Sequence, residues 1–375
     1  MSRRIQPART AAALLLAMGS AACAARPAVV AGPLPPAAAY TAWVANEASD
    51  LITRLSYTPG GDLEVVRRIG VGAPGRIAGP HGIAASSDGR FWYVSLSHGT
   101  SYGRVRKYSV DGDSLLTAVG VGPFPETVSI TPDGQYVFLT NQDLHATAQM
   151  SGISVVYTPT MTEVARPNTC PRPQGGRLNA TAATHFSVCS RTDQLVSVDA
   201  RSFAVVHRFS LTPRQEQTVD LDAHAPADAN ARCEPGWVEP GRGVRAGFVY
   251  VACRASDQVI EIDAVQWQVT RRFTFDAPGH MAIDPAGRKL VIAQPADSAL
   301  ILLDLDAATS TTIATSRSGP RGIAITADGL YAFVANEAAG AARGTVDVID
   351  LASGTRVASA EAAYAPAAID VIGVR

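Results

Sequence analysis

The chain has 375 residues, of which 47% are apolar and 17% charged, and its formal net charge is −1. This length fits one large repeat domain or two ordinary domains. The sequence has no basic stripe that would favour nucleic-acid binding. It also has no apolar run of the roughly 18 residues that a membrane helix needs. We therefore expect neither a nucleic-acid partner nor a transmembrane helix.

The first 25 residues have the pattern of an export signal. Three arginines precede a short apolar core, Ala11–Met18, and a zone of small residues, Gly19–Ala25. This pattern predicts a signal peptide over residues 1–25 and an exported protein, in the periplasm or associated with the cell envelope.

Two routes of processing remain open. Ala22-Cys23-Ala24 satisfies the small-x-small rule for soluble export, whereas Cys23 could also accept a lipid anchor. Ser20 stands where a bacterial lipobox usually has leucine. Residues 26–39 are rich in Ala and Pro without periodicity, and we predict a disordered tether there.

From residue 40 the chain repeats one pattern of four short strands. An inner strand is followed by an Asp-Gly type of turn, which tolerates positive φ, and then by a second strand. A third strand ends in Asp, and a fourth has an amphipathic pattern. Seven second strands end near Asn46, Leu96, Thr140, Cys189, Cys253, Ala293 and Asn336. This period predicts an all-β, seven-bladed β-propeller of four-stranded antiparallel blades over residues 40–375, with a β-sandwich as the alternative.

The spacing is longest between the fourth and fifth copies. The extra residues form a polar insertion near 212–232, which we interpret as a loop over the channel mouth. The first copy lacks an inner strand, and the C-terminal segment Ala367–Val374 supplies one extra. We therefore predict that this segment closes the ring by pairing with the N-terminal blade.

The copies resemble a known family at several places. The residues that carry the resemblance are Tyr93-Val94-Ser95, Thr169-Cys170, His185 to Cys189, Tyr250 to Cys253 and Gly344 to Leu351. They are similar to the exported seven-bladed YVTN-repeat propellers, in particular to a bacterial group with Cys in two neighbouring blades. That group usually has Pro-His-Gly where this chain has Pro173-Gln174-Gly175. The resemblance implies the fold, but most such proteins have no established activity.

Four cysteines occupy matching places in two consecutive blades. Cys170 precedes Cys189 by 19 residues, and Cys233 precedes Cys253 by 20. The start of an inner strand lies beside the end of the antiparallel second strand, so each pair should meet at one rim. In an oxidising compartment this arrangement predicts two disulfides within blades. The alternative is a thiolate site for a soft metal such as Cu(I), or a redox pair.

Four histidines should share that rim. His81 and His280 begin inner strands, while His98 and His145 follow second strands. Together they could form a ligand or metal site, because imidazoles bind metals and transfer protons near neutral pH. Taken singly, each is an ordinary loop residue. By the same topology, His185 should lie at the opposite face.

Three functions fit these observations. The sequence has no Gly-x-Ser-x-Gly elbow, phosphate loop or dinucleotide motif, so we assign no catalytic residue. A non-enzymatic scaffold, monomeric and without a cofactor, is the preferred reading, with a protein or small ligand at the rim. The alternatives are a copper-handling or redox accessory protein and a hydrolase of the lactonase kind, which some seven-bladed propellers resemble.

Overall fold

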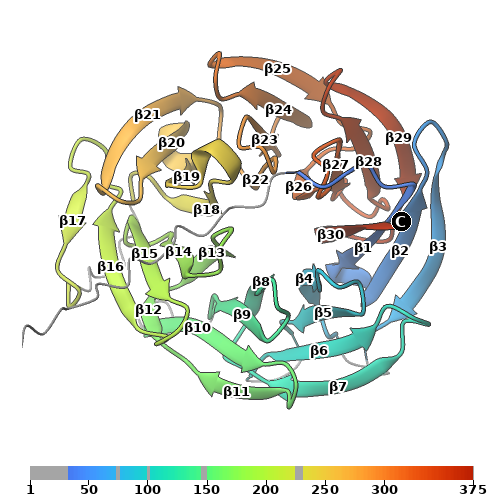
Figure 1. Ribbon diagram of the computed structural model, residues 1–375, viewed down its shortest axis with the longest axis horizontal. Helices are drawn as coiled ribbons and strands as arrows, with labels where there is room; N and C mark the ends of the chain where they lie inside the picture. Colours follow the sequence, from blue (N-terminus) through green and yellow to red (C-terminus); the bar gives the residue numbers. More distant parts are fainter. Residues whose placement is uncertain (1–32, 73–76, 99–101, 145–149, 224–230, 375) are drawn as a thin grey trace, which may run out of the picture.

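The chain forms a ring of seven antiparallel sheets around a central channel (Figure 1). The computed structural model describes residues 33–374 apart from 73–76, 99–101, 145–149 and 224–230. We number the sheets as blades 1 to 7 in the order of their second strands along the chain. The predicted all-β, seven-bladed propeller is confirmed.

The strands of each blade are given from the channel outward. Blade 1 contains β30 (Pro366–Val374), β1 (Ala39–Asn46), β2 (Leu51–Tyr57) and β3 (Leu63–Gly70). Blade 2 contains β4 (Pro80–Ala85), β5 (Phe91–Leu96), β6 (Arg104–Ser109) and β7 (Leu115–Gly120). Blade 3 contains β8 (Pro125–Ile130), β9 (Tyr136–Asn141), β10 (Met150–Tyr157) and β11 (Thr162–Ala165), with β12 (Asn168–Pro171) also paired to β10.

The remaining four blades follow the same order. Blade 4 contains β13 (Pro173–Leu178), β14 (Thr184–Cys189), β15 (Gln194–Asp199), β16 (Val205–Ser210) and β17 (Gln217–Val219). Blade 5 contains β18 (Pro235–Pro240), β19 (Phe248–Cys253), β20 (Gln258–Asp263) and β21 (Gln268–Thr274). Blade 6 contains β22 (Met281–Ile283), β23 (Lys289–Gln294), β24 (Ala299–Asp304) and β25 (Thr309–Ala314). Blade 7 contains β26 (Pro320–Ile325), β27 (Tyr331–Asn336), β28 (Thr345–Asp350) and β29 (Thr355–Glu361).

Helices are short in the described part of the chain. Three 3-10 turns occur there, η1 (Glu47–Ser49), η2 (Gly243–Arg245) and η3 (Arg254–Ser256). Within the same residues, no helix has the length and apolar character needed to cross a bilayer.

The turns between inner and second strands follow the predicted chemistry. The glycines of these turns in blades 2, 3, 6 and 7 have φ between 67° and 75°, a region where a Cβ atom is strained. In blade 2 the carboxylate of Asp88 accepts a hydrogen bond from the Ser86 hydroxyl at 2.6 Å and one from the Arg90 backbone N–H at 3.0 Å. These bonds fix the corner that connects the two strands.

The ring closes through the C-terminal strand. β30 pairs antiparallel with β1, in a register that runs from Ala39 opposite Val374 to Asn46 opposite Pro366. Figure 1 shows β30 beside β1, as the innermost strand of blade 1. The prediction of closure by the C-terminal segment is confirmed. Ile369 and Val371 of β30 pack in a core shared with residues of blade 7, including Phe333 and Val348.

The insertion differs from its predicted position. Its residues Gln217–Val219 form β17, which pairs with β16 and widens blade 4 at the outer edge. The guanidinium of Arg208 donates to the Leu221 carbonyl at 2.7 Å and holds the next part of the loop there. The prediction of a loop over the channel mouth is wrong for these residues, because the outer strand offers unpaired backbone groups that the insertion satisfies.

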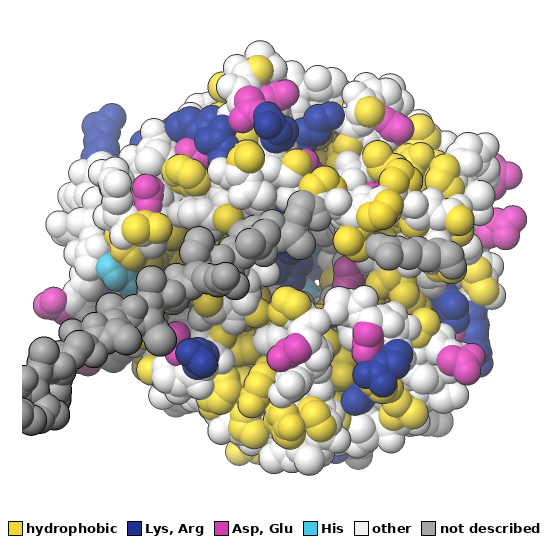
Figure 2. All heavy atoms as spheres, viewed as in Figure 1, with side chains coloured by type: hydrophobic (Ala, Val, Ile, Leu, Met, Phe, Trp, Pro, Cys, Tyr) yellow, Lys and Arg dark blue, Asp and Glu magenta, His cyan; other side chains and the backbone are white. Residues whose placement is uncertain are grey.

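The end of the predicted tether runs along one face of the ring. The backbone N–H of Leu34 donates to Ala327 at 3.0 Å, and that of Ala37 donates to the Asp328 carboxylate at 3.1 Å. Residues 1–32, with the predicted signal peptide and Cys23, lie outside the described residues. Figure 2 shows the surface in the same view, hollowed at the centre of the ring with charged side chains inside the hollow.

Candidate functional site

The channel mouth is built by one repeated position. Six inner strands begin with a proline that pairs with the last residue of the second strand. The residue before each proline has positive φ, between 46° and 64°. This sharp turn brings the residue after the proline to the mouth. These residues are His81, Glu126, Gln174, Gly236, Arg321 and Ala367, and in blade 6 Gly279 follows Pro278, with His280 one position deeper.

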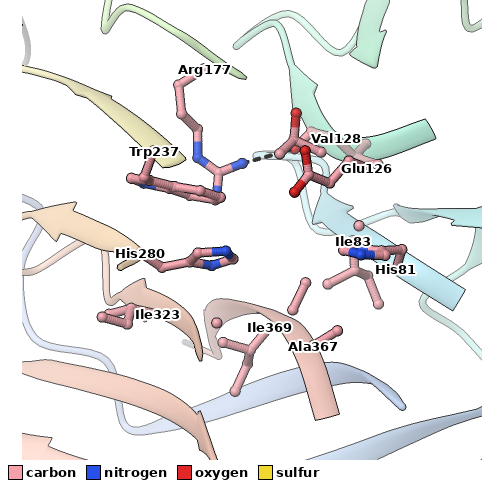
Figure 3. Close-up of a pocket in the computed structure, with 14 residues that line it drawn as sticks. His81, Ile83, Glu126, Val128, Arg177, Trp237, His280, Ile323, Ala367 and Ile369 are labelled. Atoms are coloured by element: carbon pink, nitrogen blue, oxygen red, sulfur yellow. Dashed lines mark hydrogen bonds between the residues drawn. The ribbon is translucent and has the colours of Figure 1, made fainter. Parts of the chain in front are cut away.

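A cavity lies just inside this mouth, and Figure 3 shows the side chains around it. His81, Glu126 and Ala367 of the repeated position line it, together with Arg177, Trp237 and His280 from deeper positions. The rest of the lining is apolar or glycine: Gly82, Ile83, Val128, Gly322, Ile323, Ala368 and Ile369, with Thr127 as the exception. Charged groups are thus concentrated in a largely apolar wall.

Glu126 is the acidic group of this cavity. Its side chain belongs to a residue that is only 4% exposed, and one carboxylate oxygen accepts a hydrogen bond from the Gly175 backbone N–H at 3.2 Å. Burial disfavours the charged form and raises the pKa of Glu126 to about 7. At neutral pH this carboxyl group therefore exists in both protonation states, which suits proton transfer.

The two imidazoles of the cavity are neutral at physiological pH. Burial, with the positive charge of Arg321 nearby, lowers the pKa of His81 to about 4. Burial and the same arginine also lower the pKa of His280 well below its ordinary value. The Arg321 guanidinium lies 3.3 Å from His81 Nε2, so that nitrogen acts as an acceptor. The His280 ring stacks on Trp237 with centroids 3.8 Å apart.

Arg177 enters the cavity from blade 4. Its guanidinium lies 4.5 Å from the centre of the Trp237 ring, on the side away from His280 as drawn in Figure 3. One N–H group donates to the Val128 carbonyl at 3.4 Å, and Nε lies 3.9 Å from a carboxylate oxygen of Glu239. A positive charge with donors directed at the cavity can bind an oxygen that gains negative charge.

A second group of side chains forms the outer edge of the mouth. His98 Nε2 lies 3.1 Å from Glu47 Oε1, and the other oxygen of Glu47 lies 3.9 Å from His81 Nε2. The ring of Phe124 meets both imidazoles edge-on, at centroid distances of 5.6 Å to His81 and 5.1 Å to His98. Gly79 is required here, because a Cβ atom would lie 1.9 Å from the His98 ring.

The structure therefore gathers three of the four predicted rim histidines, His81, His98 and His280, on one face. His145 lies outside the described residues. His185 is fully buried and stacks on Phe138 at 5.4 Å, so it does not reach the opposite surface. Among the residues that the structure describes, no group of three or more His, Cys, Asp or Glu is arranged to hold a metal ion.

The four cysteines form the two predicted disulfides. Cys170 of β12, which pairs with the blade 3 sheet, bonds to Cys189 of blade 4, and Cys233 bonds to Cys253 of blade 5. The predicted pairing is confirmed, but the first disulfide links two neighbouring sheets instead of lying within one blade. A Cu(I) site would need these sulfurs as thiolates, so the structure offers that alternative no ligand from these four residues.

Sequence reasoning missed Glu126, Arg177 and Trp237. A signal for Glu126 was present, since it follows Pro125 as His81 follows Pro80. Aligning the residue after each inner-strand proline would have brought Glu126 and Arg321 into one set with His81. Trp237 had a similar signal, since it lies two residues after Pro235 as His280 lies two residues after Pro278. Arg177, four residues after Pro173, had none.

Comparison with known proteins supports the fold and gives one functional lead. The family described as lactonase, seven-bladed β-propeller, matches residues 36–151, which is less than half of the chain. The matched part contains His81, His98 and Glu126 but ends before Arg177 and His280. No functionally curated protein matches the sequence significantly. The resemblance of the sequence to the YVTN-repeat propellers stays a prediction.

Several solved structures share the architecture. Kuenenia stuttgartiensis hydrazine synthase aligns with a TM-score of 0.61 and 14% identity, over 78% of this chain and 89% of that chain. A Desulfotomaculum acetoxidans protein of unknown function aligns with a TM-score of 0.66 and 12% identity, over 89% of this chain and 99% of that chain. A Bacteroides uniformis protein provisionally assigned as a 6-phosphogluconolactonase aligns with a TM-score of 0.63 and 14% identity, over 89% of this chain and 99% of that chain. At these identities the likeness concerns the fold alone.

Proposed function

We propose that this protein hydrolyses a lactone or a related ester at the channel mouth, with Glu126 as the general base. The observation that carries the proposal is the Glu126 carboxyl, buried in the cavity with a pKa near 7. The lactonase family match over the first blades supports this choice over the scaffold function that the sequence favoured. The chemistry needs no metal ligand set.

The reaction divides between two side chains. Glu126 as the carboxylate takes a proton from a water molecule, whose oxygen attacks the ester carbonyl carbon. Arg177 donates hydrogen bonds to the carbonyl oxygen while it carries negative charge. The bond from that carbon to the ring oxygen then breaks, and the leaving alkoxide takes the proton back from Glu126. Water is consumed and a hydroxy acid forms.

The neutral imidazoles favour this assignment. His81 and His280 bear no charge near pH 7, so neither competes with Glu126 as an acid, and their low pKa values make them poor bases. They can hydrogen-bond to hydroxyl groups of a substrate. The apolar walls limit the access of water around Glu126, and this burial is the physical cause of its raised pKa.

Proton release from a panel of five- and six-membered lactones tests the proposal. We expect turnover by the purified wild type and a loss of about 10²- to 10⁴-fold in kcat for Glu126→Gln, as for removal of a general base. Glu163→Gln is the matched control, because Glu163 pairs with Arg166 on the outer strand β11. Turnover that survives Glu126→Gln contradicts the assignment of the base.

Non-catalytic binding at the same mouth is the second candidate. The observation in its favour is the stack of Arg177, Trp237 and His280, which occupies one side of the cavity and leaves limited room. Calorimetry with lactones and with their hydroxy acids separates the two functions. Binding without turnover at any pH between 5 and 9 would favour this candidate.

The proposal includes the location of the protein. Two disulfides are compatible with an oxidising compartment, as expected for an exported protein. Export through the predicted signal peptide, and a lipid on Cys23, remain proposals that mass measurement of the mature N-terminus can test.

A further inference from the structure

The cavity around Glu126 is too small to hold a whole lactone. Its volume is about 20 Å³, and a single buried water molecule needs about 10–15 Å³. Sites for small ligands usually have a volume of about 300–1,000 Å³. The inner cavity therefore suits the water molecule that Glu126 would activate, and most of the substrate has to lie outside it.

A second hollow has the volume that a small ligand needs, about 390 Å³. It lies between η1, the loop that follows β27 and the turn that precedes β30, and these three segments meet at the same rim as the mouth. We call it the outer hollow. The side chains of its wall are mostly small and apolar, and among them are Ala48, Ala338, Ala341, Ala342 and the ring of Tyr364.

Arg321 connects the outer hollow with the inner cavity. Its guanidinium lies 3.8 Å from the carboxylate of Glu337, which lines the outer hollow, and 3.3 Å from Nε2 of His81, which lines the inner cavity. Glu47 directly precedes Ala48, and its carboxylate lies 3.6 Å from the same guanidinium and 3.9 Å from His81 Nε2. A substrate that presents its carbonyl group to Glu126 can therefore extend across Arg321 into the outer hollow.

The charges around the outer hollow limit what it can bind. Glu337 is the charged residue of its wall, and no Lys or Arg lines it in the part of the chain that the structure describes. Arg321 at its border already lies between the carboxylates of Glu47 and Glu337. A phosphate or carboxylate group would meet a negative charge there without a cation of its own, which disfavours it. An apolar chain would instead be covered by the alanine methyl groups and the Tyr364 ring.

We infer that the outer hollow binds an uncharged, apolar side chain of the substrate, so that the lactones hydrolysed at the mouth carry an alkyl or acyl chain and no phosphate. The inference rests on the proposed function. It assigns the reacting end of the substrate to the inner cavity and the side chain to the wall formed by Ala341, Ala342 and Tyr364.

Kinetics with five-membered lactones that carry no side chain, a butyl chain or a hexyl chain test the inference. In the wild type we expect kcat/KM to rise about twofold to fourfold for each added CH₂ group, and a lactone with a phosphate group to be a poor substrate. Ala342→Trp should fill the outer hollow and reduce the preference for the hexyl lactone over the unsubstituted one by about tenfold or more. Ala339→Trp is the matched control and should keep the preference, because Ala339 is exposed in the same loop but does not line the hollow.

Calorimetry with the corresponding lactams measures binding without turnover and separates this inference from the proposed function. The inference is overturned if the hexyl lactam binds no more tightly than the unsubstituted one, if both tryptophan variants weaken its binding equally, or if the phosphorylated lactone is preferred. If chain length and Ala342→Trp change the lactam affinity as expected but no lactone is hydrolysed, the hydrolase proposal fails while the binding site stands. Both variants should melt like the wild type, because Ala339 and Ala342 are exposed.

Discussion

The closure seam and the channel mouth lie beside each other but are built in opposite ways. At the seam, β30 and β1 pair over their whole length, and Ile369 and Val371 enter an apolar core with Phe333. At the mouth, carboxyl, imidazole and guanidinium groups are buried in apolar surroundings that disfavour their charges. The seam therefore stabilises the fold. The mouth destabilises it, because groups that can transfer protons are buried where their charged forms are disfavoured.

The largest effect should come from breaking the seam. A chain that ends at Pro366 loses β30 and leaves β1 with an unpaired edge at the centre of the ring. Each lost hydrogen bond costs roughly 1 kcal/mol net, and the apolar contacts of β30 add to this. The sum is comparable to the total stability of a typical domain, about 5–15 kcal/mol.

We therefore expect the shortened chain to be insoluble or to melt far below the full chain in calorimetry. Loss of Arg375 alone, beyond β30, should have no such effect and serves as the control. A shortened chain with a wild-type melting temperature would mean that the ring does not depend on this strand.

The next prediction concerns the energetic cost of the mouth. Burial raises the pKa of Glu126 from its ordinary value of 4.5 to about 7. Since the unfolded chain releases this proton first, stability is fully present below pH 4.5 and falls as pH rises toward 7. Glu126→Gln removes this loss and should stabilise the protein at pH 8 by about 3 kcal/mol.

Urea unfolding at pH 4 and pH 8 measures this difference. At pH 4 the variant and the wild type should be nearly equal, because the carboxyl is mostly protonated in both the folded and the unfolded state. The same variant that loses catalysis would thus gain stability in alkaline buffer. A variant that is equally or less stable than the wild type at pH 8 would show that the buried charge carries no such cost.

The smallest effect should come from the turn that precedes β30. Ala365 has φ +51°, a left-handed conformation that costs an alanine about 1–2 kcal/mol. Glycine adopts it freely but loses about 0.5–1 kcal/mol of chain entropy. Ala365→Gly should therefore stabilise the fold by about 0.5 kcal/mol. Ala352, whose φ is not positive, is the matched control, and Ala352→Gly should be slightly destabilising in the same urea titration.

Phe124 and Glu234 stand at the corresponding turns of blades 3 and 5, also with positive φ. Glycine there would relieve the same strain but remove the ring beside His81 and the partner of Arg254. We therefore expect Ala365→Gly to change only the stability of the fold. Glycine at Phe124 or Glu234 should also change the pKa values of the titratable groups at the mouth.

The sequence by itself determined the architecture. Seven blades and closure by the C-terminal strand follow from the alternating apolar residues, the Asp-Gly turns and the number of strands. These patterns are local and recur in each repeat. The pairing of the cysteines followed from their matching spacing in two consecutive repeats, although only Cys233 and Cys253 join within one blade. Even the common face of His81, His98 and His280 follows from where each stands in its repeat.

Only the tertiary structure decided which of these residues share a cavity and in which charge state. Glu126 and His81 are 45 residues apart and Arg177 lies a further blade along the ring, and β-bulges set the register of the deeper residues. The pKa of Glu126 depends on how completely the apolar walls of the cavity exclude water. Burial of this kind is a property of the closed ring, and no single repeat contains it.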